Sequence, residues 1–235
     1  MDIIGINNKR TIAFQLLFVS LIGVGLTLLF SDVLYPLWGW PASSPMPGRT
    51  YVLLVIILLL AHFTGGIGSL GLRKQRNYFL TAGAVIGIIL ADLFILVPLK
   101  DYLRDALNLP TADLGILGNI HGNLAVYGAW LLVAWTAAAI GEEVIFRGFL
   151  LTRLEALFGG SIGATAIAVF LQAGIFGIGH AYQGPGAAFS IGVGAIFSGL
   201  VFLLLRRNLV PLIIAHGLWD SLGLSLIFMH GAPTT

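Results

Sequence analysis

Seven long runs of apolar residues divide this chain and constrain its fold more than any other feature. They are Thr11–Phe30, Tyr51–Leu72, Tyr78–Leu99, Leu124–Phe146, Ile162–His180, Ala187–Leu205 and Leu209–Phe228. A helix of about 20 apolar residues crosses a hydrocarbon core about 30 Å thick, and helices satisfy their own backbone hydrogen bonds in lipid. We therefore predict an all-α, polytopic membrane bundle with about seven transmembrane helices, within a range of six to eight.

The composition agrees with lipid as the main solvent. Hydrophobic residues make up 58% of the chain and charged residues 9%, whereas a soluble domain has about 25% charged residues. The absence of cysteine excludes disulfides, thiolate nucleophiles and cysteine metal sites. A net charge of +2 gives no reason to expect nucleic acid as a partner.

The basic residues between the runs predict the orientation of the chain. If the N-terminus is cytoplasmic, the cytoplasmic loops hold Lys9, Arg10, Arg73, Lys74, Arg76, Arg153, Arg206 and Arg207, and the opposite loops hold Arg49, Lys100 and Arg104. This bias follows the positive-inside rule. The first run is near full span length and no small-residue cleavage site follows it, so we expect a retained helix. These features predict a multi-pass protein of the cell membrane with a cytoplasmic N-terminus.

Seven ionisable residues are candidates for positions at membrane depth, where each charge costs about 2.5–3.5 kcal/mol. They are Asp92, Glu142, Glu143, Arg147, His180, His216 and Asp220. All but Asp92 follow residue 141, and this clustering predicts a functional site. Asp92 could belong to an internal hydrogen-bond network or to the site, and its role is left open.

The first polar motif places two adjacent carboxylates before an arginine. On a helix Glu143 and Arg147 are four residues apart and can pair, while Glu142 is turned about 100° away. A desolvated carboxyl group without a cationic partner is suited to general acid–base chemistry. The alternative is that both carboxylates only anchor Arg147 and its helix.

Two further motifs place histidines on the later helices. Phe176 and His180 are one turn apart with small residues between them, and His216 and Asp220 are four apart and can share a face. Either histidine could instead be structural: His180 as a satisfied interfacial residue, and His216 with Asp220 as a polar pair that joins helices. Acids and imidazoles on three helices are nevertheless what a site inside a bundle requires.

The ordered triple Glu142-Glu143-x-x-x-Arg147, Phe176-x-x-x-His180 and His216-x-x-x-Asp220 resembles the signature of the CPBP intramembrane peptidases. This family includes the type II CAAX prenyl endopeptidases and bacteriocin-processing, Abi-like immunity proteins. The resemblance covers residues 120–230. It implies variable N-terminal helices with three spans over residues 1–119 and a four-span catalytic core over residues 120–235, within one compact membrane domain.

The resemblance also implies roles for the motif residues. Glu142 with His180 would activate a water for attack on a peptide bond, and His216 with Asp220 would stabilise the oxyanion or help to place the water. Glu143, Arg147 and Phe176 would hold this geometry.

The sequence leaves the cofactor unknown. Glu142, His180 and His216 could form a His₂Glu zinc site with one open position. A glutamate-activated water needs no metal, and the chain lacks the His-Glu-x-x-His helix of ordinary zinc peptidases.

We therefore predict a glutamate-dependent endopeptidase inside the membrane, acting on a peptide or membrane-protein substrate. The main alternative is a non-catalytic scaffold or immunity protein that binds a peptide partner in the same pocket. A transporter is disfavoured because the polar residues lie in one half of the chain. A serine peptidase would have to use Ser161, in Gly159-Gly160-Ser161-Ile162-Gly163, which is expected at a membrane boundary.

Overall fold

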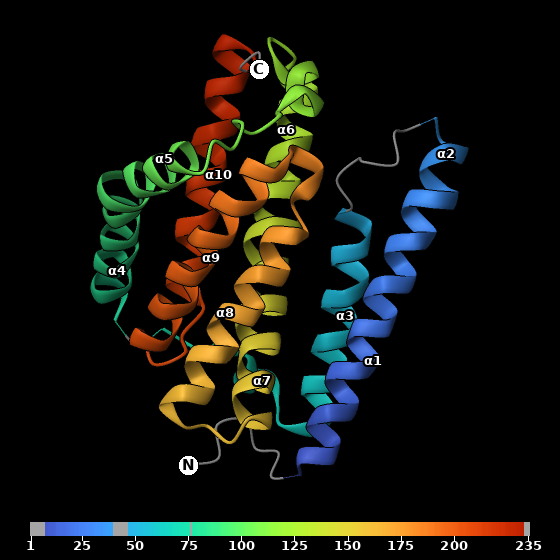
Figure 1. The fold of residues 1–235 in the computed structure, drawn as a ribbon, viewed down its shortest axis with the longest axis vertical. Helices are drawn as coiled ribbons and strands as arrows, with labels where there is room; N and C mark the ends of the chain where they lie inside the picture. Colours follow the sequence, from blue (N-terminus) through green and yellow to red (C-terminus); the bar gives the residue numbers. More distant parts are fainter. Residues whose placement is uncertain (1–7, 40–46, 76, 233–235) are drawn as a thin grey trace.

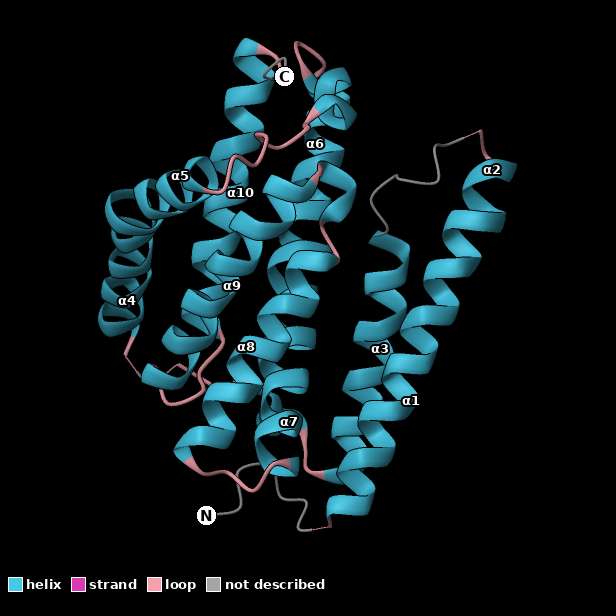
Figure 2. Cartoon of the chain, viewed as in Figure 1, coloured by secondary structure: helices cyan, strands magenta, loops and turns pink. Residues whose placement is uncertain are grey.

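The computed structural model describes residues 8–39, 47–75 and 77–232, so Arg76 lies outside the described residues. Within these ranges the chain forms helices and loops and no strands (Figure 2). The predicted all-α, polytopic membrane bundle is confirmed. The chain is an integral, multi-pass membrane protein.

Six helices in the described ranges are long and apolar enough to cross a membrane. Their parts are α1 (Lys9–Leu28), η1 (Leu29–Leu34) and α2 (Tyr35–Leu37); α3 (Pro47–Thr64); α4 (Tyr78–Ala91), η3 (Asp92–Leu96) and α5 (Val97–Ala106); α6 (Leu124–Val133), η5 (Ala134–Leu151) and α7 (Thr152–Leu157); α9 (Pro185–Leu204); and α10 (Val210–His230). A seventh, α8 (Ile162–Ile178), has 17 residues, at the short end of the range for a span. Short helical turns are η2 (Ile67–Leu70), η4 (Gly115–Ile120) and η6 (Ala181–Gln183).

The long helices alternate in direction along the bundle (Figure 1). The connections α3–α4, α7–α8 and α9–α10 lie toward the end where α1 begins, and α10 finishes at the opposite end (Figure 1). The loops predicted to be cytoplasmic therefore lie on one side. Which side faces the cytoplasm stays a prediction.

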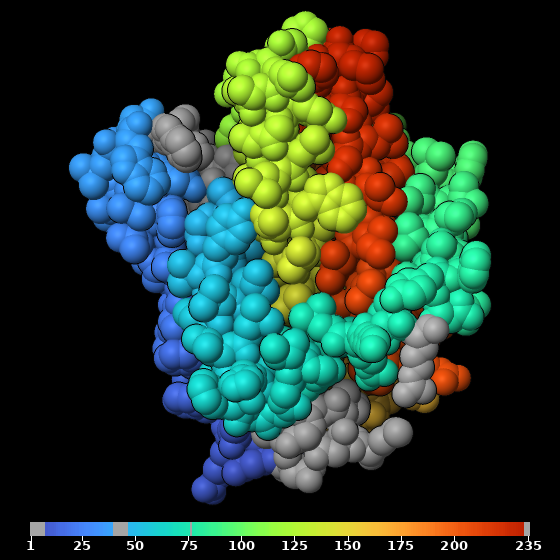
Figure 3. Space-filling model, turned by 180° about the vertical axis from the view of Figure 1, so that it is seen from behind, coloured from blue at the N-terminus to red at the C-terminus, as the bar shows by residue number. Residues whose placement is uncertain are grey.

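The helix formed by α6, η5 and α7 is the central element of the fold. It packs against α3 and α10, and seen from behind these helices lie on either side of it (Figure 3). Val144 and Phe149 on η5 are buried in a core with Ile57 of α3 and Phe202 of α9. The backbone hydrogen bonds of η5 follow the wider π-helical pattern. Single π-helical turns within α-helices are frequent at functional sites.

Glycines let the neighbouring backbones come close to this core. A Cβ at Gly148 would lie 2.6 Å from the carbonyl oxygen of Leu70. A Cβ at Gly177 of α8 would lie 2.5 Å from the carbonyl oxygen of Ala188 on α9. These distances are far below van der Waals contact, so only glycine fits at either crossing. The glycines therefore fix how closely η5 and α8 approach their neighbours.

Candidate functional site

The bundle contains a partly open cavity of about 960 Å³. Its lining includes every ionisable residue that the sequence singled out, together with Phe176: Asp92, Glu142, Glu143, Arg147, His180, His216 and Asp220. The remaining lining is mainly apolar. A large apolar cavity with a few convergent polar groups is typical of a binding site.

Glu142 and His180 face each other across this cavity. The Oε1 atom of Glu142 lies 3.9 Å from Nε2 of His180, and both side chains are partly exposed, at 20% and 18%. His180 Nδ1 lies 2.9 Å from the carbonyl oxygen of Phe176. Because a carbonyl only accepts, Nδ1 donates there, and in a neutral ring Nε2 presents its lone pair to Glu142. The 3.9 Å gap is too long for a direct hydrogen bond, and one water can bridge it.

Glu143 forms the second part of the site. Its Oε1 atom lies 3.3 Å from Nη1 of Arg147 and accepts a hydrogen bond of 3.1 Å from Nδ1 of His216. On its other side His216 Nε2 lies 3.5 Å from Oδ2 of Asp220. Glu143 and Arg147 are almost fully buried, with 3% and 2% of their side chains exposed. The expected Glu143–Arg147 and His216–Asp220 pairs are therefore present, and the Glu143–His216 bond joins them.

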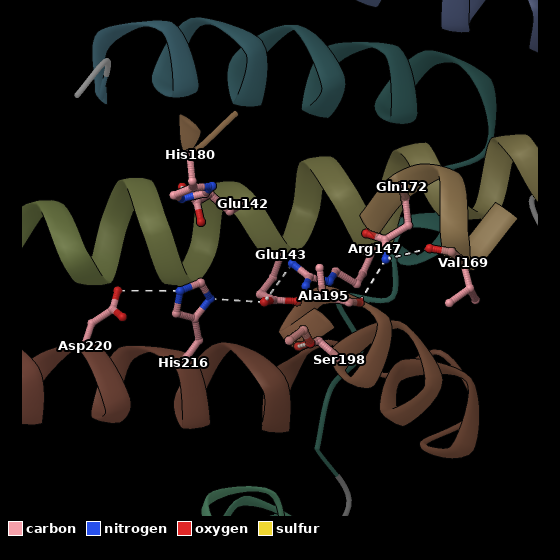
Figure 4. A network of polar contacts seen from close by, with 11 residues as sticks. Glu142, Glu143, Arg147, Val169, Gln172, His180, Ala195, Ser198, His216 and Asp220 are labelled. Atoms are coloured by element: carbon pink, nitrogen blue, oxygen red, sulfur yellow. Dashed lines mark hydrogen bonds and ion pairs between the residues drawn. The ribbon is translucent and has the colours of Figure 1, made fainter. Parts of the chain in front are cut away.

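The two parts lie on different sides of the central helix. In Figure 4, Glu142 and His180 lie together on one side of it, and Glu143, His216 and Asp220 lie on the side that faces α10. The two adjacent carboxylates are thus directed to different partners.

Phe176 connects the two parts. Its ring centroid lies 4.7 Å from the guanidinium carbon of Arg147 and 4.7 Å from the ring of His180. A guanidinium over an aromatic face is attracted by the ring quadrupole. The Phe176 carbonyl also orients His180. Phe176 therefore contacts Arg147 and His180 with its ring and holds the imidazole of His180 with its backbone carbonyl.

The zinc site that the sequence left open does not match this arrangement. The described residues include no group of three or more His, Asp or Glu side chains placed to hold a metal ion. The two ring nitrogens of His216 face Glu143 and Asp220, which leaves neither directed at Glu142 and His180. The geometry gives no support for a metalloprotease, and we assign no step to a metal.

Asp92 has a partner on its own helix. Its Oδ1 atom lies 3.7 Å from Nζ of Lys100, and both residues line the cavity. The structure therefore places Asp92 in an ion pair at the cavity wall.

Two lining residues escaped the sequence reasoning. Tyr182 follows His180 on η6 and accepts a hydrogen bond of 2.9 Å from Nε2 of Gln183. Burial raises the pKa of the Tyr182 phenol above its usual value, so its own proton stays available for donation. Arg49, assigned from the sequence to a loop, lies in the first turn of α3 and lines the cavity. Neither residue belongs to a motif, and only the proximity of Tyr182 to His180 in sequence could have drawn attention to it.

Ser161 does not lie in the cavity lining. Its side chain accepts a hydrogen bond of 3.2 Å from the backbone N–H of Ala164 and so caps the start of α8. This is an ordinary N-cap role.

Residues 125–222 match the family model described as type II CAAX prenyl endopeptidase Rce1-like. This range contains all three polar motifs. Neither the curated proteins nor the solved structures gave a match.

Proposed function

We propose that the chain hydrolyses peptide bonds within the membrane through a water activated by Glu142, on the premise that its residues 125–222 match the Rce1-like family model of type II CAAX prenyl endopeptidases. The observation that carries the proposal is the pairing of Glu142 with His180 across a 3.9 Å gap inside a large cavity. Two acceptors at this separation can bind one water between them and orient its oxygen toward a substrate carbonyl.

The reaction follows from this arrangement. Glu142 accepts a proton from the water, while the second hydrogen of the water points to Nε2 of His180. The water oxygen bonds to the carbonyl carbon and gives a tetrahedral intermediate. When the C–N bond breaks, the protonated Glu142 passes its proton to the leaving amine. Water is thereby divided between the new carboxyl group and the new amine.

The developing oxyanion needs hydrogen-bond donors, and the second part of the site supplies candidates. His216 donates from Nδ1 to Glu143, and its Nε2 atom lies at the cavity lining, 3.5 Å from Oδ2 of Asp220. When the ring is protonated, the Nε2–H of His216 can donate to the oxyanion, and Asp220 holds the ring in place. Donors that are fixed before the reaction stabilise the transition state most. Glu143, Arg147 and Phe176 act as positioning residues for His216 and His180.

The test compares the purified wild type with Glu142→Gln on a library of quenched-fluorescent membrane peptides. The amide cannot take a proton from water, so we expect cleavage to fall by about 10²- to 10⁴-fold. Glu142 makes no hydrogen bond to another described residue, so the variant should stay folded in a thermal-unfolding assay. The matched control is Asp105→Asn, an exposed carboxylate outside the cavity, which should cleave like the wild type.

The other outcomes contradict the proposal in different ways. A Glu142→Gln variant that retains wild-type rates would show that this carboxylate is not the base. Loss of wild-type activity on adding a zinc chelator would indicate a metal-dependent reaction. Peptides that bind to the wild type and are never cut would favour the non-catalytic scaffold.

A further inference from the structure

Arg49 is the cationic residue of the cavity lining that lacks a carboxylate partner among the described residues. Arg147 pairs with Glu143, and Lys100 pairs with Asp92. Arg49 donates one hydrogen bond, of 3.0 Å, from Nη1 to the hydroxyl of Thr27, and no described carboxylate lies within 4.0 Å of it. A guanidinium has five N–H donors, so most of its capacity is left for a ligand.

The packing of α3 holds Arg49 beside the candidate catalytic pair. A Cβ at Gly141 would lie 2.7 Å from Cγ2 of Thr50, so the first turn of α3 rests against the residue that precedes Glu142. The next residue of α3 is Tyr51, whose hydroxyl is hydrogen-bonded to that of Thr136, about one turn before Gly141 on η5, at 2.7 Å. Both contacts hold the first turn of α3 against η5.

Arg49 lines the same cavity as Glu142, Tyr182 and His180. A cation in an apolar cavity is costly unless it is paired, and the guanidinium fork matches the geometry of a carboxylate.

We propose that Arg49 is a specificity-determining residue that pairs with a carboxylate of the substrate and so selects the peptide bond that reaches Glu142. The carboxylate is either the C-terminal group of a peptide or an Asp or Glu side chain near the cleavage site. This inference rests on the proposed peptidase function. It assigns part of substrate recognition to α3, which lies outside the matched residues 125–222.

The first experiment measures binding, with cleavage prevented by Glu142→Gln. The probes are three fluorescent peptides with one shared apolar sequence: a free C-terminal acid, its C-terminal amide, and that amide with one glutamate near the end. We expect one or both carboxylate peptides to bind about tenfold or more tightly than the plain amide. The peptide that shows this gain identifies the source of the carboxylate.

The gain should depend on the guanidinium of Arg49. Adding Arg49→Gln should abolish the gain in affinity without weakening the binding of the plain amide peptide. Arg49→Lys should restore part of the gain, because lysine returns the positive charge without the two-pronged geometry of the guanidinium. Arg104→Gln, which removes a cation that pairs with Asp101 outside the cavity, should leave the gain unchanged.

Equal affinity for all three peptides, or binding of none of them, would overturn the inference. An equal loss of affinity for all three peptides in Arg49→Gln would also overturn it, because it would indicate a structural role for Arg49. Cleavage of the same peptides by the wild type separates the two proposals. Arg49-dependent binding without cleavage refutes only the peptidase function. Cleavage without any preference for a carboxylate refutes only the role of Arg49.

Discussion

Two adjacent glutamates illustrate how neighbouring residues acquire different chemistry. Glu143 is ion-paired with Arg147, accepts a hydrogen bond from His216 and is almost fully buried. Glu142 has His180 at 3.9 Å and is partly exposed to the cavity. A neighbouring cation and an accepted hydrogen bond both stabilise the charged form of a carboxylate and hold it in place. At the scale of the residue, Glu143 is thus suited to holding Arg147 and His216 in place, and Glu142 is suited to proton transfer.

The buried pair of Glu143 and Arg147 makes a prediction for stability. Replacing either partner, by Glu143→Gln or Arg147→Met, leaves the other charge buried, which should lower the free energy of unfolding by about 3–5 kcal/mol. Chemical unfolding in detergent micelles measures this loss. The double variant should lose less than the sum of the single losses, because no charge is then stranded. Additive losses would mean that the two residues act independently.

At the scale of the element, glycines set the crossing of α8 with α9. Gly177 faces the carbonyl of Ala188 and the backbone of Gly192. The same stretch of α8 carries Phe176 and leads directly into His180. The position of α8 against α9 therefore also sets the distance between His180 and Glu142.

This crossing is tested by Gly177→Ala. The added Cβ would lie 2.5 Å from the oxygen of Ala188, so the helices must separate, and we expect a loss of about 1–3 kcal/mol in unfolding free energy together with reduced cleavage. Gly174→Ala is the matched control on the same helix, because its Cβ would meet nothing within 4 Å. It should be neutral or slightly stabilising, since alanine favours a helix over glycine. Similar losses in both variants would show that the crossing is not responsible.

At the scale of the whole molecule, both parts of the predicted domain division contribute to one cavity. Arg49, Asp92 and Lys100 line it from residues 1–119, and the three motifs line it from residues 120–235. The matched family range falls entirely within the second part. The division itself stays a prediction, and the cavity provides a physical reason to keep both parts in one unit.

The orientation of the molecule is also a prediction, and the cysteine-free chain is a direct host for testing it. A single cysteine at Lys74, in the exposed connection between α3 and α4, should be protected from a membrane-impermeant thiol reagent in intact cells. A single cysteine at Tyr102, exposed on α5 toward the opposite end, should react. Labelling of position 74 from outside, with protection of position 102, would show that the chain has the opposite orientation to the predicted one.

The sequence by itself determined the helical membrane class, the approximate number of spans and the residues of the three motifs. Span length is a local property, because a helix must bury a fixed length of apolar chain in lipid. Pairing at i and i+4 is local too, so Glu143 with Arg147 and His216 with Asp220 could be predicted from spacing.

Only the tertiary structure decided which groups meet across helices. The bond of His216 to Glu143 rather than Glu142 and the approach of Arg49 to the cavity depend on how the helices are rotated and at what depth they cross. Those quantities are set by side-chain packing and by close contacts at glycines such as Gly141 and Gly177. The contacts join residues far apart in the chain, and for this reason no spacing within a single helix specifies them.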